Sequence, residues 1–179
     1  MPDQLIRQHP IIDEVLETNR QAIGPLYPVW PTHSYRMLNI CANACPQEPV
    51  DKFAVAIAFH DLPAAIDGDL RYLDRAAALA RTWLIDHGLP EWVPEVSAMI
   101  VNHHKIRPYT GPHAATVDAF RRADWIDVAL GHWCGGQDKN LVARINRELP
   151  LQEGRRALTS IVLPYALRHP LKPLPMLRW

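Results

Sequence analysis

The stretch VDKFAVAIAFHDL, residues 50–62, decides the fold. Alanine, valine, isoleucine and phenylalanine occupy successive positions, so an α-helix formed here is apolar on most of its circumference. The helix ends in an adjacent histidine and aspartate, His60 and Asp61. An ionised carboxylate in an apolar segment costs several kcal/mol unless a cation or good hydrogen bonds accompany it. The stretch therefore predicts a buried helix that ends in His60 and Asp61, and the Asp61 carboxylate requires a cation or hydrogen bonds. A metal ion is one such cation.

Prolines divide the rest of the chain into further helices. They gather at 25–31, 46–49, 90–94, 108–112 and 164–175, and proline breaks a helix interior while it is tolerated in the first turn. Between these clusters the apolar period is close to 3.6 residues, which indicates helices rather than strands. We predict an all-α, compact bundle of seven or eight helices. The predicted ranges are about 4–23, 32–45, 50–62, 70–87, 91–105, 113–133, 138–148 and 152–168.

Capping residues suggest where some of these helices begin and end. Thr32 or Pro31 is expected to open the helix 32–45, and Asp69 the helix 70–87, which Gly88 closes. The segment 171–179 contains two prolines and is expected to be an extended arm. Its leucine, methionine and tryptophan side chains are expected to pack on the body or on a second subunit, so a homodimer is possible.

Length and composition favour one globular domain, residues 1–179. Nineteen basic and nineteen acidic residues balance, which argues against broad nucleic-acid binding. Three cysteines do not make a disulfide framework, and Cys41 and Cys45 are expected to be inert core thiols. No signal peptide and no membrane-spanning run is evident, so we expect a cytoplasmic protein without a membrane partner.

Four residues far apart in the sequence are candidate metal ligands: His33, His60, Asp61 and Asp124. Imidazoles and carboxylates are the ordinary ligands of first-row divalent ions. Each residue alone also has a simpler explanation: His33 as an ordinary residue of a helix N-terminus, Asp61 as a cap or ion-pair member, and Asp124 as an i,i+3 partner of Arg121.

As a set, the four residues resemble the ligands of the HD-domain superfamily of metal-dependent phosphohydrolases. A histidine is followed 27 residues later by His-Asp, and 63 residues beyond that by an aspartate. The segments IAFHDL (57–62), MIVNHHK (99–105) and RADWID (122–127) are similar to the family's motifs. The similarity covers about residues 27–135, leaving a C-terminal helix and tail at 152–179. It implies a helical bundle around one divalent ion, for which Mn, Fe, Co, Ni, Zn and Mg all remain open.

The resemblance also implies a function. A bound divalent ion activates water and polarises a phosphoryl oxygen, which suits hydrolysis of a small phosphate ester or nucleotide. Phosphomonoesterase, nucleotidase and phosphodiesterase activities all fit. The alternative is a zinc-dependent hydratase, similar to the cyanamide-hydrating members, or a noncatalytic module that senses small molecules.

Basic residues near the candidate ligands are the expected substrate contacts. Arg36 lies one helical turn after His33, and His104 and Lys105 follow the apolar run 99–101, so all three are candidates for binding a phosphate. Arg36 could instead form a surface ion pair. Residues 103–105 could instead lie at a helix C-terminus, where the helix dipole attracts cationic side chains.

The proton-transfer group is less obvious. Relatives that hydrolyse nucleotides often carry a glutamate three residues after the His-Asp pair, where this chain has Ala64. Asp67 and Asp127 are the candidates that remain. The two-iron oxygenases of the superfamily need a further histidine near residues 72–75, where this chain has none, so one metal ion is expected. A second ion held by His103 or His104 is the alternative.

Overall fold

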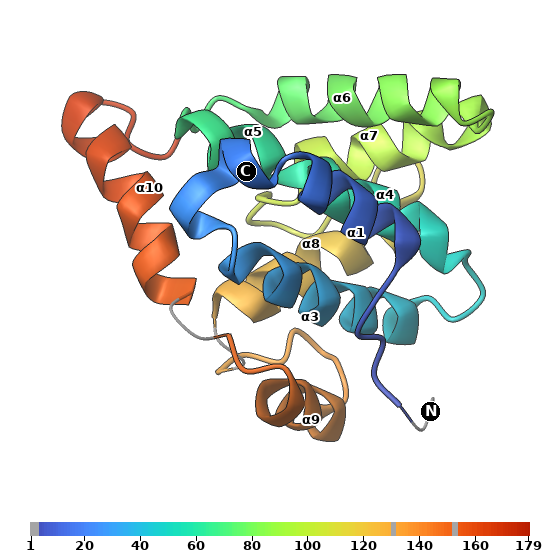
Figure 1. Cartoon of the computed structure of the whole chain (residues 1–179). Coiled ribbons are helices and arrows are strands. Elements are labelled where there is room, and N and C mark those ends of the chain that lie inside the picture. The colour runs from blue at the N-terminus through green and yellow to red at the C-terminus, as the bar shows by residue number, and fades with distance from the viewer. Residues whose placement is uncertain (1–3, 130–131, 152–153) are drawn as a thin grey trace.

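The protein is all-α, as predicted (Figure 1). The computed structural model describes residues 4–129, 132–151 and 154–179, without the side chains of residues 155 and 158. These residues form no β-strand, and one isolated parallel bridge pairs Lys105 with Arg178. None of the helices within them has the length and apolar character needed to cross a bilayer. The elements are α1 (Pro10–Thr18), α2 (Arg20–Ile23), η1 (Gly24–Leu26), α3 (Val29–Ala44), α4 (Val50–His60), α5 (Leu62–Asp67), α6 (Leu73–Asp86), η2 (Pro90–Trp92), α7 (Val93–Asn102), α8 (Ala114–Val128), α9 (Lys139–Glu148) and α10 (Gly154–Arg168).

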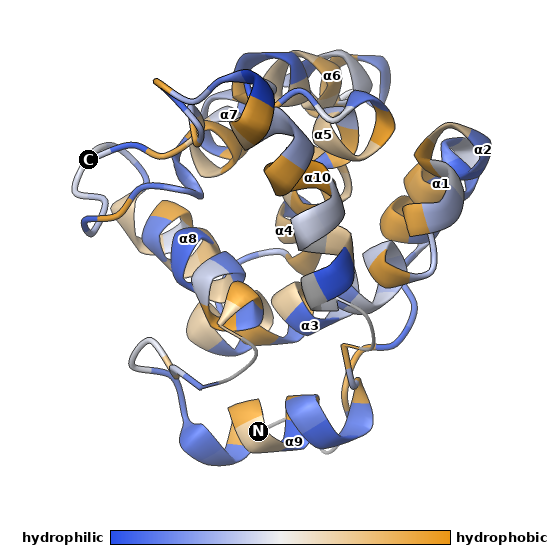
Figure 2. Ribbon diagram, turned by 90° about the vertical axis from the view of Figure 1, so that its left-hand side faces the viewer, coloured by the Kyte–Doolittle hydropathy of each residue, from blue (hydrophilic) through white to orange (hydrophobic). Residues whose placement is uncertain are grey.

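Helix α4 lies in the middle of the molecule (Figure 2). Every residue from Lys52 to His60 is buried, as expected of a helix that is apolar all round. Helices α1, α3, α6 and α7 pack against α4, and α8 packs against α3 and α7. The amphipathic helix α9 contacts α3 and buries Leu141, Val142 and Ile145, while most of its surface is hydrophilic in Figure 2.

A break in the helix separates His60 from Asp61. Helix α4 ends at His60 instead of continuing to residue 62, and α5 begins at Leu62. Asp61 has φ −112° and ψ 0°, outside the helical range, and Pro63 lies in the first turn of α5, where proline is tolerated. Two neighbours in an unbroken helix point about 100° apart. Here His60 Nε2 lies only 3.3 Å from Asp61 Oδ2, so the two side chains converge.

The N-terminal helix is shorter than predicted and divided in two. The range 4–23 was expected to be one helix, but α1 begins at Pro10, because the residue before a proline favours extended backbone and His9 adopts it. The segment before it is held instead by Asn39, whose side-chain amide accepts from the Ile6 N–H and donates to the Ile6 carbonyl, both at 2.9 Å. Asn19 then separates α1 from α2.

Two of the predicted helix starts are wrong and one predicted end is confirmed. Helix α3 starts at Val29, so Pro31 and Thr32 lie inside it, with Pro31 in the first turn, where no amide hydrogen is needed. Asp69 does not cap α6, which starts at Leu73; its carboxylate accepts the Arg71 N–H at 2.9 Å and closes a local turn. Gly88 does close α6, with φ +73° and its N–H bonded to the Ile85 carbonyl.

The C-terminal arm packs on the body through fewer side chains than predicted. Met176 is buried, and the Ile106 N–H donates to the Arg178 carbonyl at 2.8 Å. Leu171 and Trp179 are exposed on this chain, so for these two side chains only the second predicted alternative, packing on another subunit, stays a prediction. The cysteines are free thiols, as predicted. Cys41 is buried in the core, whereas Cys45 is only partly buried and packs against it. The predicted ranges 113–133 and 152–168 include residues 130–131 and 152–153, which lie outside the described residues.

A buried ion pair joins α4 to α7 near the N-terminal end of α4, while His60 is at the other end of this helix. Lys52 Nζ lies 2.8 Å from Glu95 Oε2 and 2.7 Å from Glu48 Oε2, and the Thr116 hydroxyl also donates to Glu95. Burial of Glu95 opposes its ionisation, but Lys52 and Thr116 outweigh that and lower its pKa below 4.5.

Replacing Glu95 with glutamine is expected to lower the free energy of unfolding at pH 7 by about 1–3 kcal/mol, because it leaves the Lys52 ammonium without its buried counter-charge. A group whose pKa is lowered by folding stabilises the protein above its ordinary pKa, and this stabilisation is lost as the pH falls through the folded value. The difference between wild type and Glu95→Gln should therefore shrink below about pH 4.5. Urea unfolding from pH 7 to pH 3.5 measures it, with Glu91→Gln at an exposed position as the control. An equal loss of stability at all pH values would contradict the ion-pair explanation.

Candidate metal centre

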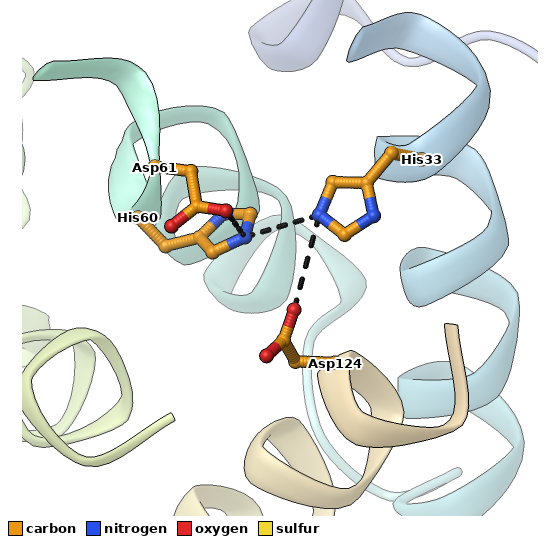
Figure 3. Close-up of side chains that lie close together, drawn as sticks. All are labelled: His33, His60, Asp61 and Asp124. Atoms are coloured by element: carbon orange, nitrogen blue, oxygen red, sulfur yellow. Dashed lines mark hydrogen bonds and ion pairs between the residues drawn. The ribbon is translucent and has the colours of Figure 1, made fainter. Parts of the chain in front are cut away.

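The four residues predicted as metal ligands converge in the structure (Figure 3). His33 comes from α3, His60 and Asp61 from the break between α4 and α5, and Asp124 from α8. Each offers a nitrogen or oxygen atom, and these atoms lie within 4.8 Å of one another. Ligand atoms that lie about 2.0–2.2 Å from one ion are at most about 4.4 Å apart. The cluster is therefore close to the size that a shared divalent ion requires.

In its neutral form, each of the two imidazoles presents an unprotonated nitrogen to the cluster. His60 Nδ1 lies 2.8 Å from the Ile57 carbonyl oxygen, which only accepts, so Nδ1 carries the hydrogen and Nε2 is left with its lone pair. His33 Nδ1 likewise donates to Asp127 Oδ2 at 2.7 Å. The two Nε2 atoms face each other at 3.2 Å. A ring N–H bonded to a carbonyl or a carboxylate, with the opposite nitrogen free, is the usual arrangement of metal-binding histidines.

Asp124 is the strongest sign that a cation belongs here. It is buried, and neither carboxylate oxygen has a hydrogen-bond partner among the described residues. His33 Nε2 lies 4.0 Å from Oδ1, and His104 Nδ1 lies 3.4 Å from Oδ2. Buried carboxylates without partners are rare because of their desolvation cost. The unpaired oxygens of Asp124 and the facing imidazole lone pairs fit a divalent cation between them.

The pKa values within the cluster reflect its negative charge. Burial opposes protonation of His60, but Asp61 outweighs burial and raises the pKa of His60 to about 9. Burial also opposes ionisation of Asp61, yet His60 and His103 keep the pKa of Asp61 well below its usual range. The pKa of Asp124 is lowered too, because His104 and His103 outweigh its burial. The two carboxylates therefore stay ionised, and their negative charge favours protonated imidazoles or a metal ion beside them.

Asp127 and Arg36 orient His33 through hydrogen bonds on the side of its ring that faces away from the cluster. Asp127 was predicted to transfer protons, but its carboxylate is occupied by His33 on one oxygen and by the Arg36 guanidinium on the other. Arg36 was predicted to bind substrate, but it is buried and also donates to Asn146 Oδ1 and to the Leu149 carbonyl, both at 2.8 Å. The geometry places both residues as positioning groups for His33. The sequence contains a signal for the pair of Arg36 and Asp127. Arg36 follows His33 by three residues and Asp127 follows Asp124 by three, and the two helices that carry them pack against each other.

The structure does not bring Asp67 and Lys105 to the cluster. Asp67 ends α5 and pairs with Arg75 at 2.6 Å on the exposed surface. The Lys105 ammonium donates to the main-chain carbonyl of Trp179. His104, the third predicted substrate contact, does lie beside the cluster, and its Nε2 is 2.7 Å from the Tyr72 hydroxyl.

Sequence reasoning missed Tyr72 and did not place His103 among the expected site residues. The Tyr72 hydroxyl donates to Asp61 Oδ1 at 2.5 Å, and His103 Nε2 lies 3.4 Å from the same oxygen. Tyr72 lies just before α6 in a connecting segment, and no spacing rule links it to the other residues. His103 was visible beside His104, but only the structure distinguishes their roles.

A cavity of about 120 Å³ opens beside the cluster. Its polar end consists of His33, Asp61, Tyr72, His104, Asp124 and Asp127. Apolar side chains make most of the remaining wall, including Trp30 from α3, Ile161 from α10 and Met176 from the C-terminal arm. Lysine and arginine are absent from the described lining residues. The cavity therefore suits a small ligand with an apolar part and little negative charge.

Comparisons of the chain with protein-family models, with curated proteins and with solved structures find no match. The similarity to the HD-domain superfamily remains a proposal that rests on the sequence motifs and on the convergence of the four residues.

Replacing Asp124 with asparagine is expected to separate metal binding from stability. Without metal, the variant and wild type should differ little in stability, because the substitution removes both the desolvation cost of a buried carboxylate and its attraction to His103 and His104. With Zn²⁺ or Mn²⁺ at about 100 times its dissociation constant, wild type should gain about 2.7 kcal/mol and the variant much less. Chemical unfolding with a chelator and with added metal measures both effects, with Asp86→Asn at an exposed position as the control. Equal metal-induced stabilisation of wild type and Asp124→Asn would exclude this carboxylate as a ligand.

Replacing Arg36 with methionine is expected to destabilise the protein by about 3–5 kcal/mol, because it leaves the Asp127 carboxylate buried without its counter-charge. Adding Asp127→Asn should recover part of that loss, which a double-mutant cycle in urea would measure. If Arg36 served only substrate binding, Arg36→Met would leave the unfolding free energy unchanged.

Proposed function

We propose that this protein is a divalent-metal-dependent hydrolase that acts on a small phosphate ester or nucleotide. The observation that carries the proposal is the meeting of two imidazole nitrogens and two ionised carboxylates at one side of a small cavity, where one carboxylate has no hydrogen-bond partner among the described residues. His33, His60, Asp61 and Asp124 would hold the ion. A divalent ion bound there would lower the pKa of a coordinated water and polarise a substrate oxygen.

The surrounding residues have separate tasks in this proposal. Asp127 and Arg36 fix the ring of His33, and the Ile57 carbonyl fixes that of His60. The apolar wall excludes bulk water and strengthens the electrostatic interactions inside. His104 lies in the cavity wall between Tyr72 and Asp124, so it is the group placed to hold or pass a proton. It replaces Asp67 and Asp127 in that role.

The charge of the cavity restricts the substrate. Because Arg36 and Lys105 bind other partners, only the metal ion and His104 would offset the charge of a phosphate. A triphosphate carries more negative charge than this set can offset. The proposal therefore favours a phosphate monoester or diester of low charge with a compact, partly apolar leaving group.

The same observation favours a second candidate, a zinc-dependent hydratase for a small neutral substrate. A neutral nitrile would need no lysine or arginine in the cavity, and the described lining residues include none.

A substrate screen of the purified protein tests the two candidates. With Mn, Co, Ni, Zn or Mg added, wild type should release phosphate from at least one small ester, and Asp61→Asn should lose at least 100-fold in kcat/KM while it stays folded by circular dichroism. Asp86→Asn should retain full activity. Hydration of cyanamide or a related nitrile without phosphate release would overturn the first candidate in favour of the second. Metal binding with neither activity would favour the noncatalytic sensing module.

A further inference from the structure

Beside the four-residue cluster lies a second group with metal-ligand chemistry. Asp61, His103 and His104 each offer an atom within 4.8 Å of the others, and Asp61 belongs to both groups. His103 is fully buried, and its Nδ1 lies 2.6 Å from the Ile100 carbonyl, so its Nε2 presents a lone pair toward Asp61. On chemistry alone, this second group also suits a cation.

The hydroxyl of Tyr72 lies among these three side chains. It is 2.5 Å from Asp61 Oδ1, 2.7 Å from His104 Nε2 and 3.3 Å from His103 Nε2. Tyr72 is buried, so the phenol ring has little freedom to swing out. The hydroxyl donates its one hydrogen to Asp61 and accepts from His104, which accounts for the two shorter contacts.

The hydroxyl oxygen and a second ion compete for the same space. A cation bound by Asp61, His103 and His104 would lie about 2.0–2.2 Å from each ligand atom. The Tyr72 oxygen is already within hydrogen-bonding distance of these three atoms, so no ion can enter between them unless the phenol moves or itself becomes a ligand.

We propose that Tyr72 limits this centre to one metal ion, because its hydroxyl takes the position of a second cation between Asp61, His103 and His104. The same hydrogen bond holds one oxygen of Asp61 and leaves the other, which lies 3.3 Å from His60, for the first ion. This inference rests on the proposed metal centre. It makes Tyr72 a positioning residue that determines the number of ions.

Metal stoichiometry tests the proposal without any activity measurement. Zn²⁺ and Mn²⁺ are titrated into chelator-treated full-length protein by calorimetry, and the metal retained after gel filtration is counted by elemental analysis. Wild type should bind one ion per chain. Tyr72→Phe, which removes only the hydroxyl oxygen, should bind two, and adding His103→Ala should return the number to one.

Control variants keep the outcomes distinct. Tyr109→Phe removes a hydroxyl away from the cluster and should bind one ion, and Tyr72→Leu provides a second hydroxyl-free variant if the phenylalanine form folds poorly. Two ions in wild type, or a single ion in folded Tyr72→Phe and Tyr72→Leu, would overturn the role of Tyr72 while the metal centre stands. Failure of wild type to bind any ion would overturn the metal centre, and this inference with it.

Discussion

The constraint on which this structure depends is the burial of two carboxylates and two imidazoles next to one another in the protein interior. The Nε2 atoms of His33 and His60 lie 3.2 Å apart, and the carboxylates of Asp61 and Asp124 lie beside them. No apolar packing compensates the desolvation of two carboxylates, and Asp124 lacks even a hydrogen bond within the described chain. A fold can keep such a group only if positive charge, as a proton or a cation, enters the cluster.

The apolar character of α4 determines where the cluster of His33, His60, Asp61 and Asp124 lies. Because this helix is buried on all sides, its C-terminal end opens into the interior and not to solvent. The break at Asp61 then turns two neighbouring side chains toward one point. Helices α3 and α8, which pack against each other, add the other two residues. The location of the cluster is thus a direct consequence of helix packing.

The sequence predicted what depends on residue type and period, and missed what depends on three-dimensional contact. Apolar periodicity and proline positions predicted the all-α class and most helices, and the motif order predicted that His33, His60, Asp61 and Asp124 would meet. Arg36 and Lys105 were assigned to substrate because they are basic and near the ligands in sequence. Proximity along a helix does not tell which acceptor a long side chain reaches: Arg36 reaches Asp127, and Lys105 reaches the C-terminal arm.

The hydrogen bonds around the cluster order its side chains from the outside inward. Asn146 and the Leu149 carbonyl hold Arg36, Arg36 holds Asp127, and Asp127 holds the ring of His33. On the opposite side, His104 donates to Tyr72, and Tyr72 donates to Asp61. These bonds use the Nδ1 hydrogen of His33 and one oxygen of Asp61, so His33 Nε2 and the second oxygen of Asp61 are left to face the cluster. A site built this way is preorganised for a cation, because binding would require little movement of the side chains that surround it.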